Sequence, residues 1–463
     1  MRIILIGYLL IMFGVGIWAN KFNNDMTDFL LAGRRLGIGL ATFTLAATYF
    51  GGGYVVGLSE TAYDSGLVSW WNGIGGGIGL IAVGFMAFKM RDLSLFTVPD
   101  YLMKRFNNNF LRISSAILSL IALIGILAAQ VGAASRIFEL LGFGSTMTSA
   151  VLASLIFVIY TAIGGLWAAT LTDFIQVSIA GIGVVAAFFI ALGNIGGWGF
   201  ITEQLSSLNV GENFLSFTGG GNITFILWLT LPMVLYTLIG QDVYQRIFST
   251  KDAKTAKKAC FFSGIIIIIL TLFPVLLGIT GKVMYPELEN AGLALPKIIM
   301  ETFPTFLGGL VLSAIIAAIM STADSILTAS TSHVINDIYI KTLNKEASVS
   351  DKKMLNWSRA CTVIVGLFAV IVSALVPKIV TLLLYSYTLY TGGVFIPVVG
   401  GFFWKKATTK GALAAMITGT FIAVLGIIGV NMFGIPTEIL AGLVSLIVLI
   451  VVSLSTQKEE YSK

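Results

Sequence analysis

The chain has 463 residues and a formal net charge of +6, and 57% of its residues are hydrophobic while only 11% are charged. Soluble globular domains carry about 25% charged residues, so this composition excludes an ordinary soluble domain. The net charge does not indicate a nucleic-acid partner, because the basic residues are dispersed in short segments between apolar ones.

Apolar stretches of about 20 residues recur along the whole chain, and each is long enough to cross about 30 Å of hydrocarbon as a helix. They predict an all-α polytopic membrane protein with about 13 transmembrane helices. The approximate ranges are 3–20, 36–63, 66–89, 111–138, 146–166, 168–194, 221–248, 254–284, 302–338, 355–377, 379–402, 409–431 and 435–456. We expect the first to be a retained helix, because no small-residue cleavage site follows it. A short surface helix is expected near Phe200 to Leu208.

The distribution of the 28 Lys and Arg residues predicts the orientation of these helices. If the amino terminus lies outside, most basic residues fall in cytoplasmic segments, and the exceptions are Arg2, Arg136, Lys282, Lys297 and Lys378. An excess of Lys and Arg in cytoplasmic loops is the usual determinant of topology. The sequence therefore predicts a multi-pass protein of the plasma membrane with its amino terminus outside and its carboxyl terminus in the cytoplasm.

Glycines interrupt the second and seventh predicted helices, at Gly51 to Gly53 and at Gly240. Each glycine lowers helix stability by about 1 kcal/mol relative to alanine, so these positions favour local unwinding. Unwound backbone inside a membrane usually lines a cavity or binds an ion. The two breaks are five helices apart, an odd number, which predicts inverted repeats with a binding site at the breaks. The alternative is that the glycines only allow close helix packing.

Three acidic residues, Asp173, Asp242 and Asp324, lie within apolar segments. A carboxylate at membrane depth costs about 3 kcal/mol on insertion scales and typically lines a cation path. Asp324 belongs to a strip of oxygen ligands on an otherwise apolar helix, Ser321-Thr322-Ala323-Asp324-Ser325. This strip indicates a sodium site in a transporter. For any single Ser or Thr, the alternative is a hydrogen bond to its own helix backbone.

The first break and this strip together offer the oxygen ligands that a hard cation prefers. Ala47 and Phe50, which flank the break, can supply backbone carbonyls. Ala318, Ser321 and Thr322 place one carbonyl and two hydroxyls on a single helical face. The residues therefore predict one sodium site between the two helices.

Five segments form a specific pattern over nearly the whole chain. They are Ala46-Ala47-Thr48-Tyr49-Phe50-Gly51-Gly52-Gly53-Tyr54, Tyr160-Thr161-Ala162-Ile163-Gly164-Gly165-Leu166-Trp167, Thr172-Asp173-Phe174-Ile175-Gln176, Tyr244-Gln245-Arg246 and Ala317-Ala318-Ile319-Met320-Ser321-Thr322-Ala323-Asp324-Ser325. This pattern resembles the sodium:solute symporter family, which includes proline, glucose, sialic acid and choline transporters. The resemblance is nearest to the proline and choline branches.

The resemblance implies a LeuT-type core of two inverted five-helix repeats, in which the first and sixth core helices are discontinuous. The implied parts are an N-terminal accessory helix with a cytoplasmic loop (1–35), the first repeat (36–194), an extracellular loop (195–220), the second repeat (221–402), and two C-terminal accessory helices with a cytoplasmic tail (403–463). The family's shared sodium site would fall on Ala47, Phe50, Ala318, Ser321 and Thr322.

A second cation site is implied at an aspartate matching Asp173, together with Asp324 and Ser325. Members with this site often have Ser or Thr at the position of Asp324, so the second carboxylate is a departure from the family pattern. Two carboxylates in one site would bind a cation tightly or would share a proton. Both alternatives are open at the level of the sequence.

Side chains at the two breaks and on neighbouring helices are the candidate contacts for a solute: Tyr49, Tyr54, Asn72, Gln130, Gln241, Asp242 and Tyr387. A lone acid at the second break favours an amine or several hydroxyl donors, although Asp242 could instead pair with Arg246 as a gate. For the tyrosines, the alternative is packing in the core or at the membrane interface. The first break resembles that of the choline branch, but Tyr49 stands where that branch has tryptophan.

These observations predict a sodium-coupled secondary active symporter that imports a small amine-bearing or zwitterionic solute by alternating access. Its partners would be this solute, sodium ions and the lipid bilayer. An enzyme is disfavoured because a chain with one histidine contains no recognisable catalytic set. A sodium-dependent membrane sensor and a channel without coupled transport are the remaining alternatives.

Overall fold

The structure is a computed structural model, and it describes residues 1–19, 21, 26–208, 210–343, 351–376, 378–430 and 435–460. Within these ranges the protein is helical, and its only paired extended residues are Leu36 and Thr250. The α-helices are α1 (Arg2–Ala19), α2 (Met26–Leu31), α3 (Ile38–Tyr49), α4 (Leu58–Ser65), α5 (Trp70–Asp92), α6 (Val98–Phe106), α7 (Asn109–Leu140), α8 (Thr146–Asn194), α9 (Trp198–Ser207), α10 (Ile223–Thr237), α11 (Gln241–Ser249), α12 (Ala253–Met284), α13 (Ala294–Thr302), α14 (Thr305–Ser332), α15 (Asp351–Leu375), α16 (Ile379–Phe403), α17 (Thr409–Ile427) and α18 (Thr437–Glu460).

Nine helical stretches of the described chain are long and apolar enough to span a membrane, or ten if the bent pair α10 and α11 counts as one span. Three shorter apolar helices, Arg2–Trp18, Ile38–Tyr49 and Thr146–Ala162, lie within spans that the sequence predicts. The count of 13 is not reached by this criterion and stays a prediction. The surface helix expected near residues 200–208 is confirmed as α9.

The first break divides the second predicted span. α3 ends at Tyr49, Phe50 leaves the helical conformation at φ −77° and ψ 54°, and the chain resumes as the π-helical segment η3 (Gly53–Gly57) before α4. A Cβ atom on Gly51 would lie 2.2 Å from Thr322 Oγ1 in α14, so the missing side chain is also what lets the two helices approach. Unwinding and close packing therefore occur at the same glycines.

The second break separates α10 from α11, whose axes are bent by 41°. Gly240 is extended, at φ −62° and ψ 128°, and precedes the first residue of α11. The backbone carbonyls left by the break are paired, because Tyr244 Oη donates to Leu238 O at 3.0 Å and Tyr390 Oη donates to Ile239 O at 3.1 Å. Such pairing is what allows unwound backbone at membrane depth.

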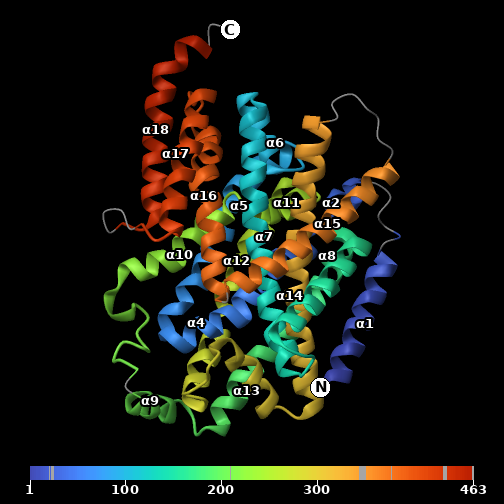
Figure 1. The fold of residues 1–463 in the computed structure, drawn as a ribbon, viewed down its shortest axis with the longest axis vertical. Coiled ribbons are helices and arrows are strands. Elements are labelled where there is room, and N and C mark those ends of the chain that lie inside the picture. The colour runs from blue at the N-terminus through green and yellow to red at the C-terminus, as the bar shows by residue number, and fades with distance from the viewer. Residues whose placement is uncertain are drawn as a thin grey trace.

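Among the candidate spans of the described chain, the one that contains α14 has the largest buried share, and those of α17 and α18 are among the least buried. In Figure 1, α17 and α18 lie together at one edge of the bundle and α1 at the opposite edge. Both broken helices contact α14, because α3 packs on it before the first break and α11 packs on it after the second. The breaks and the oxygen-rich strip of α14 are thereby brought into the interior.

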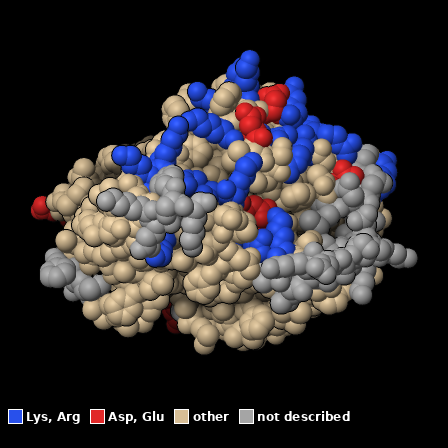
Figure 2. All heavy atoms as spheres, turned by 90° about the horizontal axis from the view of Figure 1, so that it is seen from above, with Lys and Arg blue, Asp and Glu red and all other residues tan. Residues whose placement is uncertain are grey.

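The start of α1 and the end of α18 lie at opposite ends of the bundle (Figure 1). Viewed from the end that carries the carboxyl terminus, the protein shows many Lys and Arg side chains gathered on one face (Figure 2). The basic residues that are dispersed in the sequence are therefore concentrated in space, as the positive-inside rule requires of one side of a membrane protein.

Candidate functional site

Thr322 links the middle of α14 to the end of α3, where the first break begins. Its Oγ1 donates to Ala47 O at 2.9 Å and lies 3.3 Å from Ala318 O, so one hydroxyl sits between carbonyls of two helices. Phe50, the third backbone ligand expected here, is fully buried at the end of α3. The structure therefore brings Ala47, Ala318 and Thr322 into direct contact, with Phe50 beside them.

Ser321 extends this site toward a buried acid on α8. Its Oγ donates to one carboxylate oxygen of Asp173, and Thr44 Oγ1 donates to the other. Asp173 is completely buried, and its charge interacts with the guanidinium of Arg246 on α11. A carboxylate buried at membrane depth requires such partners, and here two hydroxyls and a cation supply them.

Arg246 is the largest fully buried side chain of the described protein. Its Nε donates to Thr44 O at 3.0 Å, and one terminal nitrogen donates to the hydroxyl of Ser325. The only hydrogen bond from Arg246 to Asp242 is donated by Nη1 to the backbone carbonyl of Asp242, at 3.2 Å. The guanidinium therefore joins both breaks to α14, and it does not form the carboxylate ion pair that was the alternative for Asp242.

Asp324 points to a different neighbour from Asp173. One of its carboxylate oxygens accepts a hydrogen bond from Thr161 on α8, and the other, Oδ2, is buried without a hydrogen-bond partner among the described residues. Ser325 Oγ donates to Ser321 O at 2.7 Å. The three residues expected to form a second cation site thus lie around one region of α14, but the two carboxylates bind separate hydroxyls.

Tyrosine rings surround Asp242 at the second break. Tyr236 Oη donates to Asp242 Oδ1 at 2.8 Å, and the Tyr236 and Tyr387 ring centroids are 4.5 Å apart. Tyr390 packs on Tyr236, with ring centroids 6.0 Å apart. One carboxylate within a group of aromatic faces is a suitable environment for a positively charged nitrogen.

Tyr49 and Tyr54 line the first break on the side of this cluster, with ring centroids 5.9 Å apart. Tyr49 Oη donates to Thr237 Oγ1 at 2.8 Å, so the ring bridges the two breaks. Tyr54 Oη donates to Asn72 O at 3.1 Å, and Gln130 Oε1 accepts from Gly52 N at 2.7 Å. Asn72 Nδ2 donates to Leu229 O at 2.8 Å, so its amide is engaged with α10.

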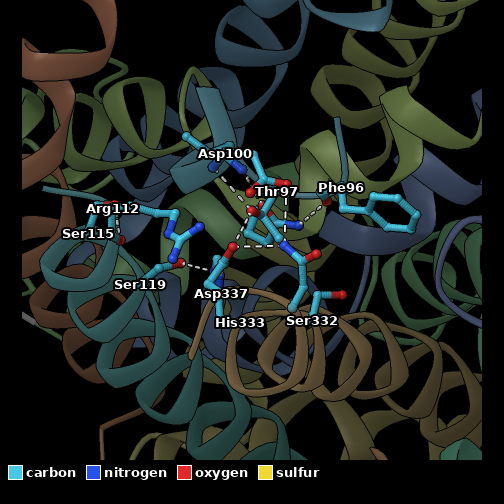
Figure 3. A network of polar contacts seen from close by, with 12 residues as sticks. Phe96, Thr97, Asp100, Arg112, Ser115, Ser119, Ser332, His333 and Asp337 are labelled. Carbon is cyan, nitrogen blue, oxygen red and sulfur yellow. Dashed lines mark hydrogen bonds and ion pairs between the residues drawn. The ribbon is translucent and has the colours of Figure 1, made fainter. Parts of the chain in front are cut away.

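Gln241 lies away from the tyrosine cluster. Its Oε1 accepts from Val98 N at 2.9 Å and its Nε2 donates to Phe96 O at 3.0 Å, so the side chain binds the turn before α6. The neighbouring Thr97 belongs to the polar network shown in Figure 3. Gln241 therefore tethers the second break to this network, and its role in solute binding stays a prediction.

The network around Thr97 joins α6, α7 and the π-helical segment η7 (His333–Leu343) that continues α14. Thr97 Oγ1 donates to Asp337 Oδ1 at 2.8 Å, and Asp337 Oδ2 lies 2.9 Å from His333 Nδ1. Figure 3 shows His333 and Asp337 facing Ser119, whose Oγ lies 2.8 Å from His333 Nε2. The single histidine of the chain is thus part of a buried structural connection.

The sequence analysis did not predict two residues that contact the candidate site. Thr44 shares the Asp173 carboxylate with Ser321, and Tyr236 holds Asp242. Thr44 could have been found from its position one helical turn before Thr48, on the face that leads into the break. Tyr236 lies in a continuous apolar run, and nothing in its local pattern distinguishes it from a core tyrosine.

Comparison with known proteins gives a consistent result over the whole chain. The profile of the sodium:solute symporter family matches residues 29–419. The osmoregulated proline transporter OpuE of Bacillus subtilis is 29% identical over 97% of this chain and 94% of its own length. The high-affinity choline transporter 1 of Drosophila melanogaster is 29% identical over 91% of this chain and 70% of its own length.

A solved structure of a Na⁺-coupled sialic acid symporter in a substrate-bound outward-open state has the same fold. It covers 98% of this chain and 96% of its own, with a TM-score of 0.83 at 22% sequence identity. This similarity confirms the predicted fold class, an all-helical LeuT-type bundle.

Proposed function

The chain belongs to the sodium:solute symporter family, and from this premise we propose that it imports a small amine-bearing or zwitterionic solute. It is a multi-pass membrane transporter, not an enzyme, and Na⁺ is its coupling ion. The observation that carries the solute class is the cluster of tyrosines around the single carboxylate of Asp242. Proline and choline, which two relatives are named for, each carry a positively charged nitrogen.

The proposed shared sodium site consists of Ala47, Phe50, Ala318, Ser321 and Thr322. Its support is the position of Thr322 Oγ1 between the carbonyls of Ala47 and Ala318, because a small cation bound there would be coordinated by the lone pairs of these three oxygens while the hydroxyl proton turns away. Sodium there would hold the end of α3 against α14. The helix break that carries Tyr49 would then be ordered in the form that binds the solute.

This geometry accounts for coupling between sodium binding and solute binding. Tyr49 follows Ala47 in α3 by two residues and reaches Thr237 at the second break, so the sodium ligands and the solute contacts share one element. A ligand that orders α3 raises the affinity for the other ligand, and the two affinities must change by the same factor. At low internal sodium the ion leaves, the break loosens, and the solute follows.

A second cation site at Asp173, Asp324 and Ser325 is also proposed. It is supported by the burial of both carboxylates and by the unpartnered Oδ2 of Asp324. A cation or a proton bound at that oxygen would neutralise a charge that otherwise faces an apolar interior. Arg246 already contacts Ser325, so the guanidinium would have to shift for Ser325 to bind an ion.

The proposed solute site contains Tyr49, Tyr54, Asn72, Gln130, Gln241, Asp242 and Tyr387, and the structure adds Tyr236. The Gln241 side chain binds the turn before α6, so it would have to leave these partners to contact the solute. The proposed orientation has the amino terminus outside and the carboxyl terminus in the cytoplasm. It is supported by the basic residues gathered on the face nearest the carboxyl terminus. The division into two repeats, 36–194 and 221–402, with accessory segments at both ends, is part of the same proposal.

Counterflow in proteoliposomes with a panel of labelled solutes tests the solute class. Amines and zwitterions should exchange, and acids or neutral sugars should not. With the solute found, Asp242→Asn and Tyr236→Phe should each weaken solute affinity by about tenfold or more, because each removes half of a charge-assisted hydrogen bond. Tyr101→Phe in α6, outside the tyrosine cluster, is the control. Normal affinity in Asp242→Asn would refute the proposed role of this acid.

A further inference from the structure

A cleft of about 650 Å³ opens on the surface between the start of α3, the end of α5 and the start of α12. None of its lining residues belongs to the candidate cation or solute sites. Its walls carry three lysines and three phenylalanines, namely Lys254, Lys257, Lys258, Phe88, Phe261 and Phe262. All six side chains are exposed, so they are available to a molecule from outside the chain.

The lysines and two of the phenylalanines lie on one face of α12. Positions 254, 257, 258, 261 and 262 follow the spacing i, i+3, i+4, i+7 and i+8, which places them on a single helical stripe. At about 1.5 Å per residue, the phenylalanines lie about 6 Å deeper than the last two lysines. Ile265 and Ile269, exposed farther along the same stripe, continue the apolar surface. The stripe thus changes from charged to apolar along the helix axis.

The charge of the cleft has no local compensation. No acidic residue lines it, and none of the ion pairs between described residues involves Lys254 or Lys258. The nearest acid in sequence, Asp252, caps α12 by accepting from Thr255 N at 2.7 Å, and this hydrogen bond lowers the pKa of Asp252. Lys257 Nζ lies 5.3 Å from the centroid of Phe85, at the rim. At least two ammonium groups therefore face the cleft without an anion.

We propose that this cleft binds an anionic phospholipid, with its phosphate at Lys254 and Lys258 and an acyl chain along Phe261, Phe262 and the exposed isoleucines. A soluble anion would not cover the exposed phenylalanine rings of the cleft, and a neutral lipid would leave the lysines without an anionic partner. In the proposed orientation these lysines lie in the cytoplasmic leaflet, where anionic lipids are concentrated. The inference rests on the membrane-spanning fold and not on the identity of the transported solute.

Native mass spectrometry of the purified full-length chain tests this site. The protein is mixed with phosphatidylglycerol or phosphatidylcholine at equal mole fraction, with and without inorganic phosphate. The variant Lys254→Gln/Lys258→Gln removes two charges from the cleft. The matched control, Lys104→Gln/Lys406→Gln, removes two exposed lysines from the same predicted side of the membrane and outside the cleft. Melting temperatures with saturating sodium report whether each variant is folded.

Wild type should retain phosphatidylglycerol at least tenfold better than phosphatidylcholine. Two basic residues near an anionic surface together strengthen binding about thirtyfold, so the cleft variant should bind phosphatidylglycerol about thirtyfold more weakly. The control variant should match wild type. Phe261→Ala/Phe262→Ala should also weaken retention. Equal retention of both lipids by wild type, equal losses in the cleft and control variants, or displacement of the lipid by inorganic phosphate would each overturn the proposal.

Discussion

Ser321 and Thr322 of the candidate sodium site differ from other serines of α14 in the hydrogen-bond partners of their hydroxyl groups. Ser330 and Ser332 donate only to carbonyls of their own helix, Ile326 O at 2.7 Å and Thr328 O at 2.9 Å. Ser321 and Thr322 instead reach Asp173 and Ala47 on other helices. Ser330 and Ser332 therefore follow the alternative of bonding within the helix, whereas the predicted ligands Ser321 and Thr322 bond other helices. Thr331 also reaches another helix, at Thr362, so this contact pattern is not confined to the candidate site.

Replacing Thr322 by Ala tests this distinction. The variant loses the hydroxyl that joins Ala318 and Ala47, so the sodium concentration for half-maximal uptake should rise about tenfold or more. Ser330→Ala is the matched control, because it removes a buried hydroxyl of the same helix that contacts only its own backbone. Sodium activation curves of the two variants check the prediction, and an unshifted curve for Thr322→Ala would remove this residue from the site.

Asp324 gives a second test at the residue scale. Asp324→Ser keeps a side-chain oxygen and removes one of two buried carboxylates near Arg246. If Asp324 binds a cation or proton, the variant should change the steepness of the sodium dependence of uptake. The Hill slope measured at constant pH reports this, and a slope equal to that of wild type would count against the second site.

Helix periodicity in the sequence predicts candidate ligands that lie on one helix. Helix geometry predicts that Ala318, Ser321 and Thr322 share a face, and Thr322 Oγ1 lies 3.3 Å from Ala318 O. Their role as sodium ligands stays a prediction. The partners of Asp173 and Asp242 were not predictable in the same way. Thr44 and Tyr236 meet these acids across helix contacts, and only the packed bundle specifies which faces touch.

At the scale of elements, the first break is held by three neighbouring helices. Added Cβ atoms on Gly51, Gly52 and Gly53 would meet Thr322 of α14, Ala133 of α7 and Leu383 of α16, each within 2.5 Å. The break was predictable from the sequence because three adjacent glycines are a local signal. The tight contacts with three helices were not, because they depend on the tertiary arrangement.

Gly51→Ala should disturb this element at its most constrained point. The new Cβ would lie 2.2 Å from Thr322 Oγ1, and such overpacking typically costs about 1–3 kcal/mol. The displaced hydroxyl should also raise the sodium requirement. Gly39→Ala in α3 is the control, because a Cβ there has no atom within 4 Å. Melting temperature and sodium activation should change in Gly51→Ala only, and a neutral result would show that the break does not need close contact.

The limits of single spans were harder to predict than the breaks. α8 runs without interruption through 49 residues, whereas the sequence predicts two spans, 146–166 and 168–194. At about 1.5 Å per residue this length exceeds one membrane crossing more than twofold. Two successive spans also require the backbone to reverse direction, so the two spans stay a prediction. Hydropathy indicates which residues can lie in lipid. It does not indicate whether two successive spans are joined by a coil or by a bend within one helix.

For the whole molecule, the proposed orientation predicts which surfaces face each side of the membrane. Cys260 and Cys361 are both buried and unpaired, so replacing them by Ala gives a background for labelling. In that background, a membrane-impermeant maleimide should label Ser206→Cys of α9 on intact cells. Lys406→Cys should react only after permeabilisation. The reverse pattern would show that the basic face lies outside.

Sodium-driven accumulation in proteoliposomes is the most direct measurement of the central claim. With the solute identified by counterflow, an inward sodium gradient should concentrate it above its external level. A sodium ionophore, or replacement of sodium by potassium, should abolish this accumulation. Uptake that reaches the same level without a sodium gradient would contradict sodium symport by this protein.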